Sequence, residues 1–130
     1  MSMLEQKTFI SSIHPFENLT IHELDHLVES IDIVYFKEKQ IVQKPDQEPE
    51  YLFFILKGLV QEKHEDEVLS IYSKNEIFDS VSLIENHSKN TFVTTEETIC
   101  YTLPREIFIA TLQENKILKN IYKNNLPILI

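Results

Sequence analysis

One short stretch, His22-Glu23-Leu24-Asp25-His26, carries residue types that can bind a metal. It matches the HExxH pattern, in which two histidines one helical turn apart hold zinc and the glutamate acts as a general base. A zinc enzyme also needs a third protein ligand and an open coordination position in a cleft. At about 100° per residue, the two histidines fall roughly opposite the apolar side of their helix, which includes Ile21, Leu24 and Val28. We therefore predict that His22 and His26 are exposed and not catalytic, and that a zincin-like metal enzyme is only a distant alternative.

A second stretch, Ile77 to Val93, carries groups that can bind an anion. Asp79 and Ser80 are residue types that begin helices, and the apolar residues that follow them predict a short helix over residues 79–84. The N-terminus of a helix presents free backbone N–H groups, and the ammonium of Lys89 adds a positive charge nearby. The candidate site residues are Phe78, Asp79, Ser80, Val81, Ser82, Lys89, Asn90 and Thr91.

The elements around this insert are predicted to be strands. Apolar and polar residues alternate from Ile31 to Leu103, with polar breaks at residues 37–39, 44–50 and 63–67. This spacing predicts at least six antiparallel strands, arranged as a sandwich or barrel over residues 31–104. A cupin-like metal enzyme on such a barrel would need clustered histidines and glutamates on the strands, and the sequence has no His-x-His pair.

Helices are predicted on both sides of the strands. Residues 3–13 have a rough helical spacing, and Thr20 with Glu23 forms a capping box before a second helix, in which Ile21, Leu24, Leu27, Val28 and Ile31 share one face. Pro104 sits where the first residue of a helix is often found, ahead of residues 105–113, and a further amphipathic segment follows. The prediction is one domain over residues 1–130, with helices over residues 3–30 and 105–125.

The order of these segments resembles the cyclic-nucleotide-binding domain of the catabolite activator protein type. The resemblance rests on Tyr35 to Val42 (YFKEKQIV), Tyr51 to Val60 (YLFFILKGLV) with Gly58 after the third strand, the insert, and Thr98 to Phe108 (TICYTLPREIF). It implies a double-stranded β-helix, or jelly roll, with flanking helices. It also implies a regulatory module, not an enzyme, in which effector binding at the insert moves the helix from Arg105 onward.

The ligand residues of that family are replaced here. The family has Phe-Gly-Glu at its phosphate-binding cassette and a later arginine that clamps the phosphate, where this sequence has Phe78, Asp79, Ser80 and Lys89. Lys39, Pro45 and Asn75 also replace family glycines. The resemblance implies a cyclic nucleotide as ligand, whereas the substitutions leave open a different small anion. A scaffold for dimerisation or interaction, with no ligand, is the second hypothesis.

Asp79 is the substitution that decides between these hypotheses. We expect its carboxylate to cap the short helix, accepting N–H bonds from the region of Val81 and Ser82, and to lie within reach of the Lys89 ammonium. Such a carboxylate would stand in for the phosphate, and it would repel a cyclic phosphate. The predicted cassette is therefore degenerate and occupied by the protein's own side chain.

Composition limits the remaining function classes. The 130 residues are 42% hydrophobic and 25% charged, as in folded globular domains, and the net charge of −9 disfavours nucleic acid as a partner. A single cysteine, Cys100, and the lack of a signal-peptide pattern or a long apolar run predict a cytoplasmic protein with no membrane segment.

Surplus apolar residues near the C-terminus predict a homodimer or docking of a further domain: Ile117, Leu118, Ile121, Tyr122, Leu126, Ile128, Leu129 and Ile130. The start at His14-Pro15-Phe16 resembles bacterial proteins in which such a module precedes paired CBS domains and a nucleotidyltransferase, which implies a fragment of a longer chain.

Overall fold

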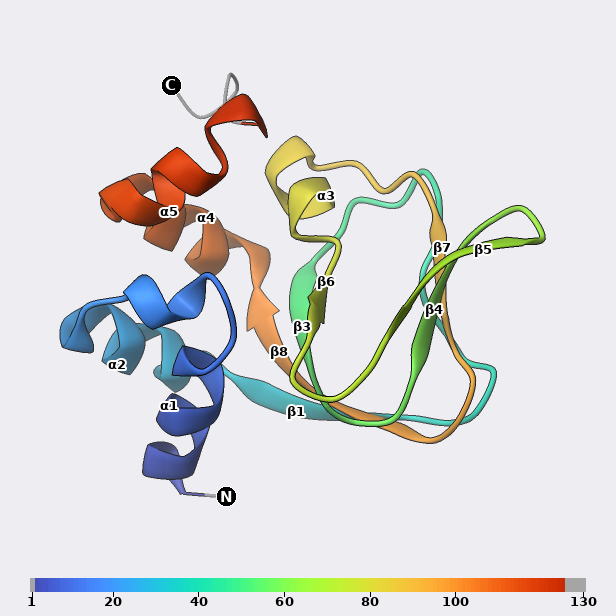
Figure 1. Cartoon of the computed structure of the whole chain (residues 1–130), viewed down its shortest axis with the longest axis horizontal. Coiled ribbons are helices and arrows are strands. Elements are labelled where there is room, and N and C mark those ends of the chain that lie inside the picture. Colours follow the sequence, from blue (N-terminus) through green and yellow to red (C-terminus); the bar gives the residue numbers. More distant parts are fainter. Residues whose placement is uncertain (1, 126–130) are drawn as a thin grey trace.

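The computed structural model describes residues 2–125 and forms a jelly-roll barrel of two four-stranded antiparallel sheets (Figure 1). One sheet has the order β1-β8-β3-β6 and the other β2-β7-β4-β5. The strands are β1 Asp32–Phe36, β2 Ile41–Gln43, β3 Tyr51–Lys57, β4 Val60–His64, β5 Glu67–Tyr72, β6 Ile77–Phe78, β7 Thr91–Thr94 and β8 Thr98–Pro104. The predicted fold class is confirmed, and the alternating residues from Ile31 to Leu103 do form the strands.

Helices lie before, after and within the barrel sequence, as the alternation predicted. They are α1 Met3–Ser11, η1 Phe16–Asn18, α2 Ile21–Glu29, α3 Ser80–Glu85, α4 Arg105–Glu114, α5 Lys116–Ile121 and η2 Lys123–Asn125. The capping box at Thr20 and Glu23 is present, whereas α1 ends at Ser11 and Pro104 is the N-cap residue of α4, one position before the expected one. In the part of the chain described, no helix is long and apolar enough to cross a membrane.

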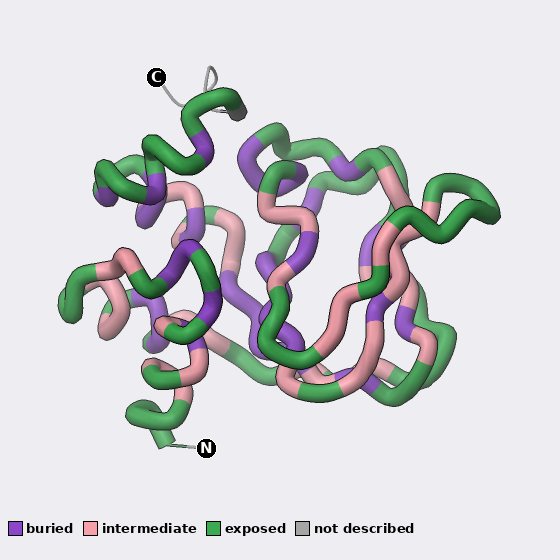
Figure 2. Tube along the Cα trace, viewed as in Figure 1, coloured by how far each residue is buried: buried purple, intermediate pink, exposed green. Residues whose placement is uncertain are grey.

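Alternation along β3 and β8 divides the core into two parts. Leu52 and Phe54 point to the side where α1, α2, α4 and α5 pack, and Phe53 and Ile55 point into the barrel. Figure 2 shows the buried segments concentrated where the helices meet the sheet and along the inner strands. The expected apolar face of α2 is wrong at one position, because Ile21 is 79% exposed while Leu27 and Val28 are buried. Ile21 opens the first turn of the helix, on the same side as Val28, but its side chain stays in solvent.

Tight turns keep left-handed backbone at two of the positions where the related family has glycine. Lys39 has φ 62° and Asn75 has φ 71°, and Asp46, next to Pro45, has φ 64°. Gly58 has φ 108°, and a Cβ atom added there would lie 2.3 Å from Oγ1 of Thr98. The turn after β3 therefore packs directly against the start of β8, and no residue with a side chain fits at position 58.

Candidate functional site

The insert between β6 and β7 is built around the carboxylate of Asp79. Asp79 has left-handed backbone, φ 60° and ψ 35°, immediately before α3, and its side chain makes no bond to the backbone N–H groups of that helix. Its Oδ1 instead accepts a hydrogen bond from Oγ of Ser82 at 2.6 Å, and its Oδ2 accepts one from Nε2 of Gln43 on β2. The predicted capping role is therefore wrong, because the carboxylate is bound by two side chains and not by the N-terminus of α3.

Lys89 does not reach Asp79. Its side chain is 70% exposed, and its Nζ lies 3.7 Å from Oε1 of Glu85, at the end of α3. The expectation that the ammonium of Lys89 neutralises Asp79 is wrong. Among residues 2–125, Asp79 forms no ion pair and no hydrogen bond with a lysine, arginine or histidine.

A second carboxylate, Glu62 on β4, lies near Asp79 within the barrel. Glu62 accepts hydrogen bonds from Oη of Tyr72 at 2.7 Å and from Nδ2 of Asn90 at 2.6 Å. Nε2 of Gln43 also donates to Oγ of Ser88 at 3.0 Å, so Ser88 connects β2 with the segment that leads to β7. These side chains form a polar network inside an otherwise apolar barrel, and its charged members are both acidic.

The negative charge of Glu62 adds to the cost of ionising Asp79. Burial, followed by repulsion from Glu62 and Glu85, raises the pKa of Asp79 from 3.8 to about 6, although its bonds from Ser82 and Gln43 oppose this. Burial and the hydrogen bond to Glu62 raise the pKa of Tyr72 to about 12. The inside of the barrel is therefore unfavourable for an additional negative charge.

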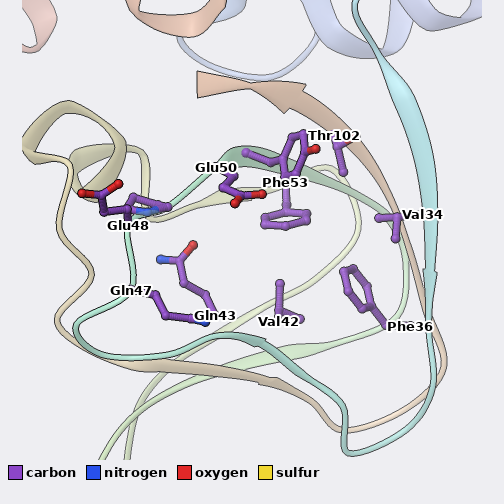
Figure 3. A pocket seen from close by; sticks show the side chains of 11 residues that line it. Val34, Phe36, Val42, Gln43, Gln47, Glu48, Glu50, Phe53 and Thr102 are labelled. Carbon is purple, nitrogen blue, oxygen red and sulfur yellow. The ribbon is translucent and has the colours of Figure 1, made fainter. Parts of the chain in front are cut away.

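A cavity of about 360 Å³ opens beside this network. Figure 3 shows residues from β1, β2, β3 and the β2–β3 segment arranged around it. The lining residues are Val34, Phe36, Val42, Gln43, Gln47, Glu48, Pro49, Glu50, Tyr51, Phe53 and Thr102. Gln43 belongs to both the cavity and the network, so it joins the two.

None of the eight residues predicted from the sequence lines this cavity. Phe78 is buried and stacks on Phe53 with ring centres 5.5 Å apart, Ser80 is bonded to the C-terminal segment, and Val81 is exposed. Ser82 donates to Asp79, and Thr91 pairs with Lys63 across β7 and β4. Of the eight, Asp79 and Ser82 meet directly.

Sequence reasoning missed Gln43, Glu62, Tyr72 and Ser88. The bonds that join Gln43 and Glu62 to the insert span 28 to 45 residues. Tyr72 is connected to it through Glu62. The local signal available was that Gln43 and Glu62 are polar residues in strands β2 and β4. Such a residue on an inward-facing position needs a buried partner.

The histidine pattern does not form a metal site in the structure. His22 and His26 are both exposed on α2, as predicted. The residues described contain no group of three or more histidine, cysteine, aspartate or glutamate side chains that could hold a metal ion. Cys100 is buried in β8, and burial raises the pKa of its thiol to about 12.

The family model described as the cyclic nucleotide-binding domain matches residues 33–115. The chain belongs to the cyclic nucleotide-binding domain family. The match begins in β1 and ends after α4, so it includes the barrel, the insert and the first C-terminal helix. No curated protein matches the chain.

Solved structures share the fold at low sequence identity. The sensor domain of the transcriptional regulator DNR from Pseudomonas aeruginosa has a TM-score of 0.81 and 17% identity, covering 94% of this chain and 86% of that one. A putative cyclic nucleotide-binding protein from Geobacter metallireducens has a TM-score of 0.78 and 17% identity, with coverage of 96% and 92%. The regulatory domain of Toxoplasma gondii PKA with cAMP has a TM-score of 0.77 and 14% identity, and the match covers 84% of this chain but 44% of that one.

Proposed function

We propose that this domain is a regulatory module whose barrel controls the position of its C-terminal helices, and whose cassette no longer takes a cyclic phosphate. The observation that carries the proposal is the position of α3. At its start, Asp79 is bound to the barrel network through Gln43, while Ser80 accepts a hydrogen bond from Oη of Tyr122 at 3.0 Å. The same short helix thus contacts the candidate ligand region and the C-terminal segment.

A second bond supports this route. Nε of Arg105, the first residue of α4, donates to the carbonyl oxygen of Leu83 in α3 at 2.6 Å. Leu83 is fully buried in the same apolar cluster as Phe108 and Leu118. A displacement of α3 would therefore need α4 and α5 to repack, because a close-packed core does not deform continuously.

The proposed loss of phosphate binding follows from charge. A cyclic phosphate placed at the start of α3 would meet the Asp79 carboxylate, with Glu62 nearby. The sequence has one arginine, Arg105, and its side chain is bonded to α3. With no basic partner for Asp79 in the part of the chain described, a second anion would be bound at a net electrostatic cost.

Two measurements test this proposal. Calorimetry with cAMP, cGMP and cyclic dinucleotides is expected to give no binding heat, and micromolar binding of any of them would overturn the closed cassette. In ¹⁵N NMR spectra, Asp79→Gly is expected to shift amide signals in α5, whereas Asp66→Gly, in the exposed β4–β5 turn, is expected to leave α5 unchanged. Shifts confined to the barrel in the Asp79 variant would refute the coupling.

The partner of the C-terminal segment is the second part of the proposal. Ile117 and Ile121 on α5 are 53% and 42% exposed, while Leu118 and Tyr122, expected to share this surface, are buried. Leu126, Ile128, Leu129 and Ile130 lie outside the described residues. We propose that Ile117 and Ile121 contact a second copy of the chain or a further domain, in a non-enzymatic protein of the cytoplasm.

A scaffold without any ligand is the alternative function. Its supporting observation is that both carboxylates already accept hydrogen bonds from the protein, Asp79 from Ser82 and Glu62 from Tyr72 and Asn90. The polar network is therefore nearly complete without a ligand. The cavity argues for the ligand-responsive module, because Oε1 of Gln43 faces it while the hydrogen bonds of the Gln43 amide to the protein are made by Nε2.

A further inference from the structure

We propose that the barrel cavity binds a small organic cation, a primary amine on an apolar or aromatic stem. This inference rests on the proposed role of the barrel as a ligand-responsive module, and it assigns that module a ligand class opposite in charge to a cyclic phosphate. Three independent features of the cavity carry it: the sign of its charges, the orientation of one buried amide, and its aromatic wall.

The charged side chains that line the cavity are acidic. Glu48 and Glu50 lie in the segment between β2 and β3, and no lysine, arginine or histidine is among the lining residues. Asp79 is one hydrogen bond further in, behind Gln43. A concave surface lined by charges of one sign raises the local concentration of the opposite ion, so the cavity attracts cations.

The amide of Gln43 has a fixed orientation. In its ionised form the carboxylate of Asp79 can only accept, so the Gln43 atom bonded to it is the Nε2 donor. Nε2 also donates to Ser88, which leaves the carbonyl Oε1 without a hydrogen bond to any residue in the described part of the chain. Gln43 is 6% exposed, and Figure 3 shows its amide extending into the space beside Phe53 and Glu50.

An acceptor held in this way selects a donor as its ligand. An ammonium group carries three N–H donors and no acceptor, so it can bond Oε1 of Gln43 and a cavity carboxylate together. A phosphate or carboxylate offers acceptors only and would leave Oε1 unsatisfied. A ligand that covers Oε1 without donating to it removes this oxygen from water at a cost larger than an ordinary hydrogen bond provides, so the atom discriminates against anions in addition to the charge.

The remaining wall suits the stem of such a ligand. Phe53 packs edge-on against Phe36 and Tyr51, with ring centres 5.8 Å and 6.3 Å away. Val34 and Val42 complete the apolar side. Aromatic faces attract cations, and about 360 Å³ lies at the lower end of the volumes that hold small ligands.

The test uses three molecules of one shape and three charges: 2-phenylethylammonium, 2-phenylethanol and phenylacetate. Each is titrated into ¹⁵N-labelled protein, and the Gln43 side-chain amide signal and the Phe53 backbone signal report binding. The amine is expected to bind at least about tenfold more tightly than the alcohol, because one charge-assisted contact contributes on this scale. Phenylacetate is expected not to bind.

Matched variants test whether the charges of Glu48 and Glu50 cause the preference for the amine. Glu48→Gln and Glu50→Gln keep the shape of the cavity, and together they are expected to remove the preference for the amine while leaving the affinity for the alcohol unchanged. Glu96→Gln, an exposed glutamate in the turn before β8, is the control and is expected to change neither affinity.

Two results would overturn the proposal. Equal binding of the alcohol and the amine would make the site a neutral aromatic pocket, and no response to 2-phenylethylammonium would exclude the cation class. Neither result bears on the closed cassette, which fails only if a cyclic nucleotide binds. The failures of the two proposals are therefore distinguishable.

Discussion

Oη of Tyr122 donates a hydrogen bond to Oγ of Ser80 at 3.0 Å, across 42 residues of sequence. Ser80 is the first residue of α3, and Tyr122 follows the last residue of α5. The ring of Tyr122 also packs edge-on against Phe108 of α4, with ring centres 6.0 Å apart. One side chain thus joins the insert of the barrel to both C-terminal helices.

Replacing Tyr122 by phenylalanine tests this joint. The ring contact with Phe108 is kept, and the bond to Ser80 is lost, so the free energy of unfolding should fall by about 0.5–1.5 kcal/mol. Urea unfolding followed by circular dichroism measures the change, since the chain has no tryptophan. Tyr35→Phe, at an exposed tyrosine on β1, is the control and should stay within about 0.5 kcal/mol of the wild type. Equal effects of the two changes would contradict the structural role of Tyr122.

Gly58 and Lys39 should respond to substitution in opposite directions. Alanine at Gly58 would place its Cβ 2.6 Å from the Cα of Thr98 in an unfavourable backbone conformation, and we expect a loss above about 3 kcal/mol. Lys39→Gly should instead stabilise the protein by up to about 1 kcal/mol, because Lys39 has φ 62°. Thermal unfolding ranks the variants.

Asn75→Gly is the matched comparison for Lys39. Asn75 also has positive φ, at 71°, but asparagine tolerates this region better than lysine. The gain at Asn75 should therefore be the smaller of the two. A destabilising effect of Lys39→Gly would argue against the left-handed turn before β2.

The strands and helices were predictable because their signals are local. The apolar run of β3 and the capping box at Thr20 each depend on residues within a few positions of one another. Ile21 was wrongly assigned to the core because helical periodicity gives the direction of a side chain but not which neighbour reaches it.

The site was predictable in place but not in its contacts. The position of the insert followed from its sequence, whereas the bonds of Asp79 depend on a left-handed backbone that turns its carboxylate away from the N–H groups of α3. Its partner Gln43 lies 36 residues earlier on another strand. Neither the backbone conformation of one non-glycine residue nor a pairing across two sheets has a local signature.

The two histidines of α2 provide a stability prediction. His22 and His26 are exposed, so alanine at both positions should change the free energy of unfolding by less than about 0.5 kcal/mol. Unfolding by urea with and without added zinc measures this. Stoichiometric zinc at this pair, found by metal analysis of untagged protein, would contradict the structural reading of the pattern.

The exposed residues of α5 provide a test of assembly. If Ile117 and Ile121 form a contact between copies, aspartate at both positions should shift the protein from dimer to monomer, because burying a carboxylate without a partner is costly. Light scattering coupled to size exclusion measures the mass. Leu4→Asp, at an exposed apolar residue on α1, is the control and should leave the mass unchanged. A wild-type protein that is monomeric throughout would leave docking of a further domain as the role of this surface.

The pH dependence of stability should carry the signature of Asp79. Its folded pKa, about 6, lies above its ordinary value of 3.8, so between these values the folded state holds more protons than the unfolded state. The contribution of Asp79 to the free energy of unfolding is therefore fully present below about pH 4, and it is lost as the pH rises through about 6. The difference between the two pKa values corresponds to a loss of up to about 3 kcal/mol in the free energy of unfolding.

Asp79→Asn isolates this effect. The asparagine cannot ionise, so the wild type should lose stability relative to the variant between pH 4 and 7, and the difference should level off above about pH 6.5. Asparagine places an NH2 group at one of the two oxygen positions that accept from Ser82 and Gln43, so one of these bonds is lost, and this adds an offset that does not vary with pH. Urea unfolding at a series of pH values measures the difference, and the groups common to both proteins cancel in it. Asp66→Asn, in the exposed β4–β5 turn, is the control, and its free energy of unfolding should have the same pH dependence as that of the wild type. If the stability of the Asp79 variant has the same pH dependence as the wild type, the carboxylate is not buried in the barrel beside Glu62 as the network requires.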